Sequence, residues 1–274
     1  MSKIFRIVAC IIVLSSCSSK FGKVFKSKDN EYRYKMAEQY YSQKQYGKAQ
    51  ELYDALASWA RGTQRFEDMT YKNAYCSYYL KDYLNAENTF KQYVEDFPTG
   101  LRVEECTYMR AYCFYKESPR VELDQTATMK AVTQMQSFLS AYPNSSRVKD
   151  AQNVITACRI KMEEKSYLSA QLYYDLGFLK ASSVTFNLLM DDFPDSERLD
   201  EYSYKAIKAY YEYAKASKID KQEERFKKVV VDCGQFTDHF QNSKYEKNIS
   251  DIKQFSEKVL KRIENEQAKT TSQS

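Results

Sequence analysis

Tyrosines spaced seven residues apart are the side chains of this sequence best suited to chemistry, and the chemistry that they suit is binding. Seven residues make about two turns of an α-helix, so the two members of each pair share one helix face. A tyrosine ring offers a large, rigid contact area, and its hydroxyl can hydrogen-bond to a peptide backbone. The five pairs are Tyr34 and Tyr41, Tyr71 and Tyr78, Tyr108 and Tyr115, Tyr167 and Tyr174, and Tyr204 and Tyr211.

These tyrosines also have a second interpretation, which is packing between neighbouring copies of a repeated helix. Both interpretations stay open for the repeated pairs. Tyr75 and Tyr112 exceed the pair pattern in the second and third copies, so we expect these two to bind a ligand. The candidate binding residues are Tyr34, Tyr41, Tyr71, Tyr75, Tyr78, Tyr108, Tyr112 and Tyr115.

Catalytic chemistry has little support in the sequence. The only histidine, His239, has Asp238 and Phe240 beside it and no candidate nucleophile. The sequence contains no Gly-rich phosphate loop and no paired-histidine or His-x-x-Glu metal spacing. We therefore expect no catalytic residue, no metal site and no cofactor.

Five cysteines remain once Cys10 and Cys17 are assigned to the amino-terminal segment described below. No Cys-x-x-Cys pair occurs, which argues against a zinc knuckle or a thioredoxin-like motif. Free buried thiols are expected, and one disulfide in an oxidising compartment is the alternative. The five are Cys76, Cys106, Cys113, Cys158 and Cys233.

The stretch Asp68–Pro98 shows the element that positions the tyrosines. Two apolar patterns of helical period lie on either side of a tight turn near Asp82. A shift of 37 residues in either direction places Ala37 and Ala111 where this stretch has Ala74. The pattern resembles the tetratricopeptide repeat, a helix pair that must stack on copies of itself. We expect an all-α superhelical solenoid of about five such pairs, and the resemblance implies that the tyrosines of the first helices line a concave groove.

Two insertions interrupt the register of the repeats. Eight extra residues enter repeat 3 between its helices, around Ser118-Pro119, and 14 extra residues separate Pro143 from Ala170. Residues 147–175 contain no Gly or Pro, which predicts one long helix that ends repeat 3 and begins repeat 4.

The predicted organisation has three parts after the leader. Repeats 1–3 occupy residues 31–143. Residues 144–263 hold the long connecting helix, repeats 4–5 and a C-terminal cap helix, because a terminal repeat needs a polar outer face. Residues 264–274 are polar and predict a disordered tail.

The amino terminus predicts a lipoprotein signal peptide over residues 1–16. Lys3 and Arg6 precede an apolar run that is too short to span a membrane. The ending Leu14-Ser15-Ser16-Cys17 resembles a bacterial lipobox, which implies that Cys17 carries the lipid; a plain signal peptide is the alternative. Residues 17–30 predict the lipidated cysteine and a solvated polar tether.

The charge of the chain argues against nucleic acid as a partner. The formal net charge of +5 falls to +3 when the two charges at Lys3 and Arg6 leave with the signal peptide. A net charge this small provides no electrostatic footprint for a polyanion.

The combination of lipobox, short tether, interrupted repeat 3, long connecting helix and aromatic-Pro helix ends resembles the BamD family of outer-membrane β-barrel assembly lipoproteins. The resemblance covers roughly residues 14–263. It implies a non-enzymatic, lipid-anchored subunit at the periplasmic face of the outer membrane. It further implies two partners, a BamA-like barrel insertase at the C-terminal repeats and the C-terminal strands of unfolded outer-membrane proteins at the N-terminal repeats.

Two other functions remain open at this point. Tyrosine faces also suit stacking on sugars, so a lipoprotein that captures nutrients or glycans is one alternative. A scaffold for another envelope machine is the second.

Replacing Cys17 with Ser should release the protein from the membrane fraction. A multiply acylated cysteine anchors stably because buried acyl chains contribute about 0.8 kcal/mol per CH₂. Fractionation of cells that express the wild type and Cys17→Ser measures the effect. Full co-sedimentation of the variant with the outer membrane would contradict lipidation as the anchor.

Overall fold

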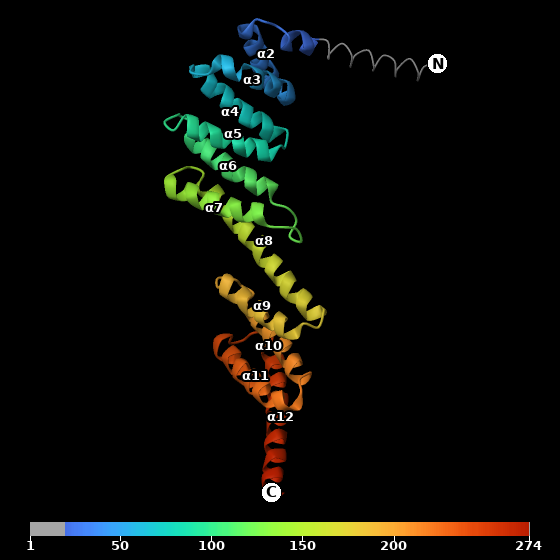
Figure 1. The fold of residues 1–274 in the computed structure, drawn as a ribbon. Coiled ribbons are helices and arrows are strands. Elements are labelled where there is room, and N and C mark those ends of the chain that lie inside the picture. The colour runs from blue at the N-terminus through green and yellow to red at the C-terminus, as the bar shows by residue number, and fades with distance from the viewer. Residues whose placement is uncertain (1–19, 274) are drawn as a thin grey trace, which may run out of the picture. The chain divides into compact units, whose positions relative to one another are not determined.

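The computed structural model describes residues 20–273. The predicted signal peptide and Cys17 lie outside the described residues. Within residues 20–273 all regular structure is helical, and successive helices pack side by side in two units that are described separately below (Figure 1). The all-α prediction and the consecutive helix pairs of a repeat solenoid are therefore confirmed.

The helices follow the predicted repeats closely. Unit 1 contains the pairs α2–α3, α4–α5 and α6–α7, and unit 2 contains α9, the pair α10–α11 and the cap helix α12, while α8 contributes to both units. The bounds are α2 Asn30–Ser42, α3 Tyr46–Ala60, α4 Gln64–Tyr79, α5 Tyr83–Asp96, α6 Val103–Glu117, α7 Thr126–Ala141, α8 Val148–Asp175, α9 Leu179–Asp192, α10 Leu199–Lys215, α11 Ile219–His239 and α12 Glu246–Gln273.

Small residues at the closest helix crossings explain why the pairs form. Ala37, Ala74 and Ala111 are fully buried at equivalent places of the first helices, where an alanine lets two backbones approach. The turn within a pair also recurs, because Lys44 and Lys81 have positive φ values of 58° and 64° at equivalent positions. Gly177 takes the same place in repeat 4 with φ 78°, a conformation that glycine adopts without strain.

The division between the two units falls between Arg159 and Ile160, inside α8. The predicted long helix is confirmed, but the compact units do not divide at residues 143/144 as the sequence analysis expects. The first half of α8 buries Ala151 and Cys158 in the core of unit 1. The second half buries Ala170 in a cluster with Phe186 in unit 2. One continuous helix therefore serves two cores.

Two segments expected to be unstructured are helical. Residues 20–25 form helical turns, not a solvated tether, because Val24 is buried on the first repeat and the ring of Phe21 lies 5.8 Å from that of Tyr40. At the other end, α12 continues through residues 264–273, where a disordered tail is expected. Its charged face stays in solvent, and the amide of Gln267 donates to Glu223 on α11 at 2.9 Å.

The insertion in repeat 3 forms an ordered loop between α6 and α7. The buried amide Nε2 of Gln125 donates to the carbonyls of Arg120 at 2.8 Å and Leu123 at 2.9 Å. The five cysteines Cys76, Cys106, Cys113, Cys158 and Cys233 are buried and form no disulfide with one another, as expected for small core residues.

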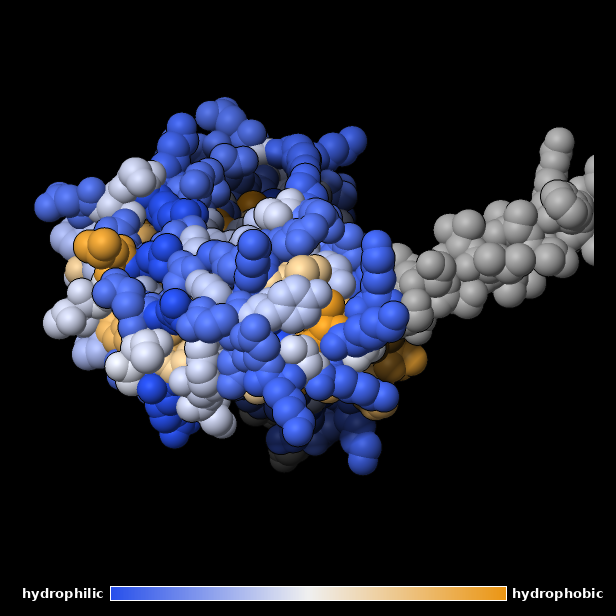
Figure 2. Space-filling view, turned by 90° about the horizontal axis from the view of Figure 1, so that it is seen from above, coloured by the Kyte–Doolittle hydropathy of each residue, from blue (hydrophilic) through white to orange (hydrophobic). Residues whose placement is uncertain are grey.

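The surface gives no sign of a membrane-spanning element. Across residues 20–273, no helix combines the length and the apolar composition needed to cross a bilayer. Figure 2, which looks from above Figure 1 onto the α2 end, shows mostly hydrophilic side chains with scattered apolar ones.

Gly100, between α5 and α6, should tolerate no side chain. A Cβ atom there would lie 2.9 Å from the hydroxyl of the buried Tyr93 and 3.1 Å from the carbonyl of Phe97. Gly100→Ala should lower the free energy of unfolding by about 1–3 kcal/mol, the usual effect of overpacking. Thermal and urea unfolding measure the change.

Gly234, in the interior of α11, is the matched control. A Cβ atom at this position meets nothing within 4 Å. Gly234→Ala should raise stability by up to about 1 kcal/mol, because alanine favours a helix interior. Equal effects of the two substitutions would contradict the packing at Gly100.

Candidate functional site

The first tyrosine of each pair lies at a seam between successive first helices. In four repeats the guanidinium carbon of an arginine from the start of the next repeat lies over the ring. The fifth ring, that of Tyr204, stacks on Tyr245 with centroids 4.5 Å apart. The distances from guanidinium carbon to ring centroid are 5.4 Å for Arg65 over Tyr34, 4.4 Å for Arg102 over Tyr71, 4.8 Å for Arg147 over Tyr108 and 4.3 Å for Arg198 over Tyr167.

Each of these arginines also pairs with a carboxylate of the preceding first helix. The resulting arginine–tyrosine–carboxylate group recurs at every junction between successive first helices up to α10, and we call it the seam. In unit 2, Arg198 donates to Glu164 at 3.0 Å and to Glu201 at 3.1 Å. In unit 1 the pairs are Arg65–Glu31 at 2.5 Å, Arg102–Asp68 at 3.1 Å and Arg147–Glu105 at 3.3 Å.

Two of the seam tyrosines also donate a hydrogen bond from the ring hydroxyl to a carboxylate of the next first helix. Tyr71 donates to Glu105 at 3.1 Å, and Tyr167 donates to Glu201 at 3.0 Å. Burial, followed by the nearby Glu105, raises the pKa of Tyr71 to about 12. Tyr34, Tyr71 and Tyr108 therefore serve repeat packing, which is the second interpretation of the sequence analysis.

Tyr75 lies in the core and not in a groove, contrary to the expectation from its extra position. It is 9% exposed, its hydroxyl donates to Glu105 at 2.5 Å, and its ring meets the edge of Phe90 at 5.2 Å. The sequence pattern could not show this, because a tyrosine one turn from a stripe can point to either side of the helix crossing.

Beyond the seam, tyrosines from three repeats form a continuous half-exposed surface on unit 1. Tyr79, which the sequence analysis did not select, is 49% exposed and stacks on Tyr46 with centroids 4.5 Å apart. The ring of Tyr78 lies 5.6 Å from that of Tyr79 and 6.4 Å from that of Tyr112. We call this surface the tyrosine band, and its members are Tyr41, Tyr46, Tyr78, Tyr79, Tyr112 and Tyr115.

The tyrosine band combines ring faces with neutral hydroxyls. Burial raises the pKa of Tyr78 to about 12 and raises that of Tyr41 above its ordinary value. Both hydroxyls therefore stay protonated at neutral pH and can donate hydrogen bonds. Tyr79 and Tyr46 could have been selected from the sequence, because Tyr79 directly follows Tyr78 and Tyr46 begins the helix after Tyr41. Neither residue fits the seven-residue spacing of the tyrosine pairs.

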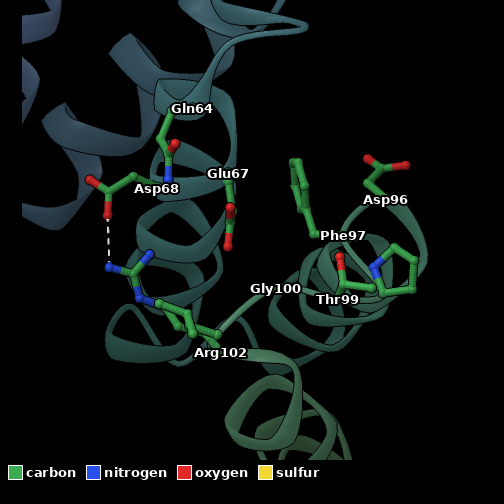
Figure 3. A pocket seen from close by; sticks show the side chains of 10 residues that line it. Gln64, Glu67, Asp68, Asp96, Phe97, Thr99, Gly100 and Arg102 are labelled. Carbon is green, nitrogen blue, oxygen red and sulfur yellow. Dashed lines mark ion pairs between the residues drawn. The ribbon is translucent and has the colours of Figure 1, made fainter.

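A recess of about 550 Å³ opens where α5 ends beside α4 and α6 (Figure 3). The side chains of Glu67 and Asp96 line it, and the ion pair of Asp68 with Arg102 closes one side (Figure 3). Glu67 accepts a hydrogen bond from Tyr93 at 2.6 Å. Asp96 accepts a hydrogen bond from Gln92 at 3.3 Å, so all three carboxylates of the recess have partners within the protein.

The remaining candidates for chemistry are the metal-ligating side chains, His239 and the cysteine thiols. No group of three His, Cys, Asp or Glu side chains within residues 20–273 could hold a metal ion. His239 is exposed at the end of α11, where Nδ1 lies 2.8 Å from the carbonyl of Gln235. Burial raises the pKa of the Cys76 and Cys113 thiols to about 12, so both stay protonated.

The paired helices and the seam define a helical repeat protein of the tetratricopeptide type. The chain belongs to the YfiO family of outer membrane lipoproteins, whose family model matches residues 26–181, more than half of the sequence. Comparison with curated proteins gives no match. Among solved structures the chain is similar to the TPR2AB-domain:pHSP90-complex of yeast Sti1, at 12% identity and a TM-score of 0.38, with 83% of this chain and 98% of the other covered.

Removing the arginine of one seam should destabilise unit 2 without unfolding it. Arg198→Ala loses the cation–π contact with Tyr167 and two partly exposed ion pairs, which together contribute about 1–2 kcal/mol. Arg198→Lys should recover only part of this loss, because lysine keeps the charge but lacks the planar stacking group. Urea unfolding measures both variants.

Arg262→Ala serves as the control for a surface ion pair. Arg262 lies 4.0 Å from Glu266 on the exposed face of α12. Its removal should change the free energy of unfolding by less than about 0.5 kcal/mol. If Arg198→Ala is as mild as this control, the seam does not hold the repeats together.

Proposed function

We propose that this protein is a non-enzymatic, lipid-anchored subunit of the outer-membrane β-barrel assembly machinery that receives the C-terminal strands of client barrel proteins. Membership of an outer membrane lipoprotein family supports the location. The observation that carries the binding role is the tyrosine band on unit 1, a half-exposed aromatic surface that spans three repeats.

The chemistry of the tyrosine band fits an extended peptide with an aromatic end. An extended strand leaves its backbone N–H and C=O groups unpaired, and tyrosine hydroxyls can serve both. The ring faces of Tyr79 and Tyr112 can take an aromatic side chain in a stacked or edge-on contact. Because the arginines of the seam already cover Tyr34, Tyr71 and Tyr108, the ligand contacts fall on Tyr41, Tyr78, Tyr79, Tyr112 and Tyr115.

The remaining roles follow the family resemblance and stay proposals. The C-terminal repeats would bind a BamA-like barrel insertase, and lipidated Cys17 would hold the chain at the periplasmic face of the outer membrane. No cofactor and no nucleic acid take part in this function. The small net charge of +5 on the whole chain agrees with protein partners.

Tyr79→Ala combined with Tyr112→Ala should weaken peptide binding by about thirtyfold or more, because truncating even one aromatic hot spot costs about 2 kcal/mol. The probe is a labelled peptide from the C-terminal strand of an outer-membrane barrel protein that ends in an aromatic residue. Fluorescence anisotropy measures affinity, and thermal melting measures stability. Melting should stay near normal, since Tyr79 is 49% exposed.

Two single variants separate binding from packing. Tyr32 is 44% exposed on α2 outside the tyrosine band, so Tyr32→Ala should leave the affinity unchanged. Tyr75→Ala should lower the melting temperature, because Tyr75 is a core residue. Wild-type affinity in the Tyr79/Tyr112 double variant would refute the tyrosine band as the peptide site.

A further inference from the structure

The second half of α8 begins a new stack of helices in unit 2. Its Tyr167 is equivalent to Tyr71 in α4. Tyr167 lies under Arg198 and Tyr71 lies under Arg102, and in both cases the arginine is 31 residues further along the chain. The buried Ser182 and Phe186 of α9 occupy the places of Ala86 and Phe90 in α5 by the same offset. An offset of 96 residues therefore maps repeat 2 onto repeat 4.

This mapping shows what normally covers the outer face of a first helix. In repeat 2, Cys76 is fully buried in a cluster with Leu52 and Leu56 of α3, the preceding second helix. The hydroxyl of Ser77 accepts a hydrogen bond from Gln50 of α3 at 2.7 Å. These two positions are therefore where a preceding second helix packs.

In repeat 4 the same two positions hold exposed apolar side chains. Leu172 replaces Cys76 and is 56% exposed, and Tyr173 replaces Ser77 and is 40% exposed. Unit 2 contains no second helix ahead of this face, since it starts at Ile160 within α8. The face that stacks elsewhere in the chain is open here.

The neighbouring helix α9 is apolar at two positions where α5 and α7 are polar. Val184 and Leu188 are 48% and 54% exposed. Their equivalents in α5 are Asn88 and Gln92, both exposed and polar. The equivalents in α7, found by aligning Ala131 with Ala86, are the polar residues Thr133 and Ser137.

The start of α9 shows the same substitution. Asp82 caps α5 by accepting a hydrogen bond from the backbone of Asn85 at 3.2 Å. Phe178 occupies this place in α9, makes no side-chain cap and is 59% exposed. Losing an N-cap costs about 1 kcal/mol, so an exposed phenylalanine here lowers stability without burying its ring.

We propose that this surface binds an amphipathic helix of a partner protein, which supplies the second helix that repeat 4 lacks. We call it the open-end surface, and it comprises Leu172, Tyr173, Leu176, Phe178, Val184 and Leu188. The proposal rests on the equivalence of Leu172 and Tyr173 in α8 to Cys76 and Ser77, the positions of α4 on which the preceding second helix packs. It is independent of the peptide-binding role of the tyrosine band, which lies on unit 1.

The recess beside the open-end surface specifies the chemistry of the partner helix. It measures about 560 Å³, and Tyr173, Phe178, Val184 and Tyr213 line it. This mostly apolar and aromatic lining suits the apolar stripe of an amphipathic helix. Lys180 also lines the recess, so the partner helix should carry an acidic residue beside its apolar stripe.

The test uses the full chain and a peptide of residues 46–60, the sequence of α3, as a mimic of the missing helix. It carries Leu52 and Leu56, which cover the equivalent face in repeat 2, and the acidic Glu51 and Asp54. Binding is measured by anisotropy and peptide helicity by circular dichroism, with a scrambled peptide for comparison. The wild type should bind the α3 peptide and induce helix in it, and should not bind the scrambled one.

Variants of the open-end surface give the decisive comparison. Leu172→Glu and Val184→Glu should each weaken binding at least tenfold while the melting temperature stays unchanged, because both side chains are about half exposed. Leu84→Glu is the matched control. Leu84 is 60% exposed on α5, at the position equivalent to Lys180 of α9. The Leu84→Glu variant should bind the α3 peptide as tightly as the wild type does.

Three results would overturn the proposal. The first is equal binding by the wild type and the two open-end variants, and the second is no binding of the α3 peptide at all. The third is a dimer of the wild type in sedimentation that Leu172→Glu abolishes, since the occupant would then be a second copy of this chain. The Tyr79/Tyr112 double variant should lose binding of the strand peptide and keep binding of the α3 peptide. That result would show that the two surfaces act separately.

Discussion

The stacking of arginine on tyrosine between successive first helices is the contact on which the rest of the structure depends. A helix pair of this kind cannot bury its apolar face alone, so each repeat is stable only against its neighbours. The seam joins the start of each first helix to the first helix of the preceding repeat. One guanidinium lies over a ring and pairs with a carboxylate of the preceding helix, as Arg102 does with Tyr71 and Asp68. An arginine suits this place because it is planar, always charged and weakly hydrated.

The seam also decides which tyrosines remain available to a partner. Along a first helix the two tyrosines of a pair lie two turns apart, and the arginine of the next repeat reaches only the first of them. In unit 1 the second member, such as Tyr78, meets other tyrosines and keeps part of its ring in solvent. The same spacing therefore produces a packing residue and a surface residue in alternation, and the tyrosine band collects the surface residues of three repeats.

Helix α8 shows how one insertion changes the surface of a repeat protein. Fourteen added residues let a single helix act as a first helix in two stacks, with Cys158 in one core and Ala170 in the other. The second stack then starts without a helix ahead of it. Exposed Leu172 and Phe178 follow directly from that topology, and the apolar residues of α9 extend the same surface. On the opposite side, Phe186 and Tyr202 are buried together in a core cluster of unit 2.

The sequence by itself determined the helix pairs, the insertion in repeat 3 and the long helix, because these depend on local period, on small residues such as Ala74 and on the absence of Gly and Pro. It also located the stripe of tyrosines to which both the seam and the tyrosine band belong. Only the tertiary structure decided that Tyr75 is core, that Tyr79 is surface and that residues 20–25 cover the first repeat. These outcomes depend on which neighbouring helix reaches a side chain, and periodicity within one helix carries no information about the helix packed against it.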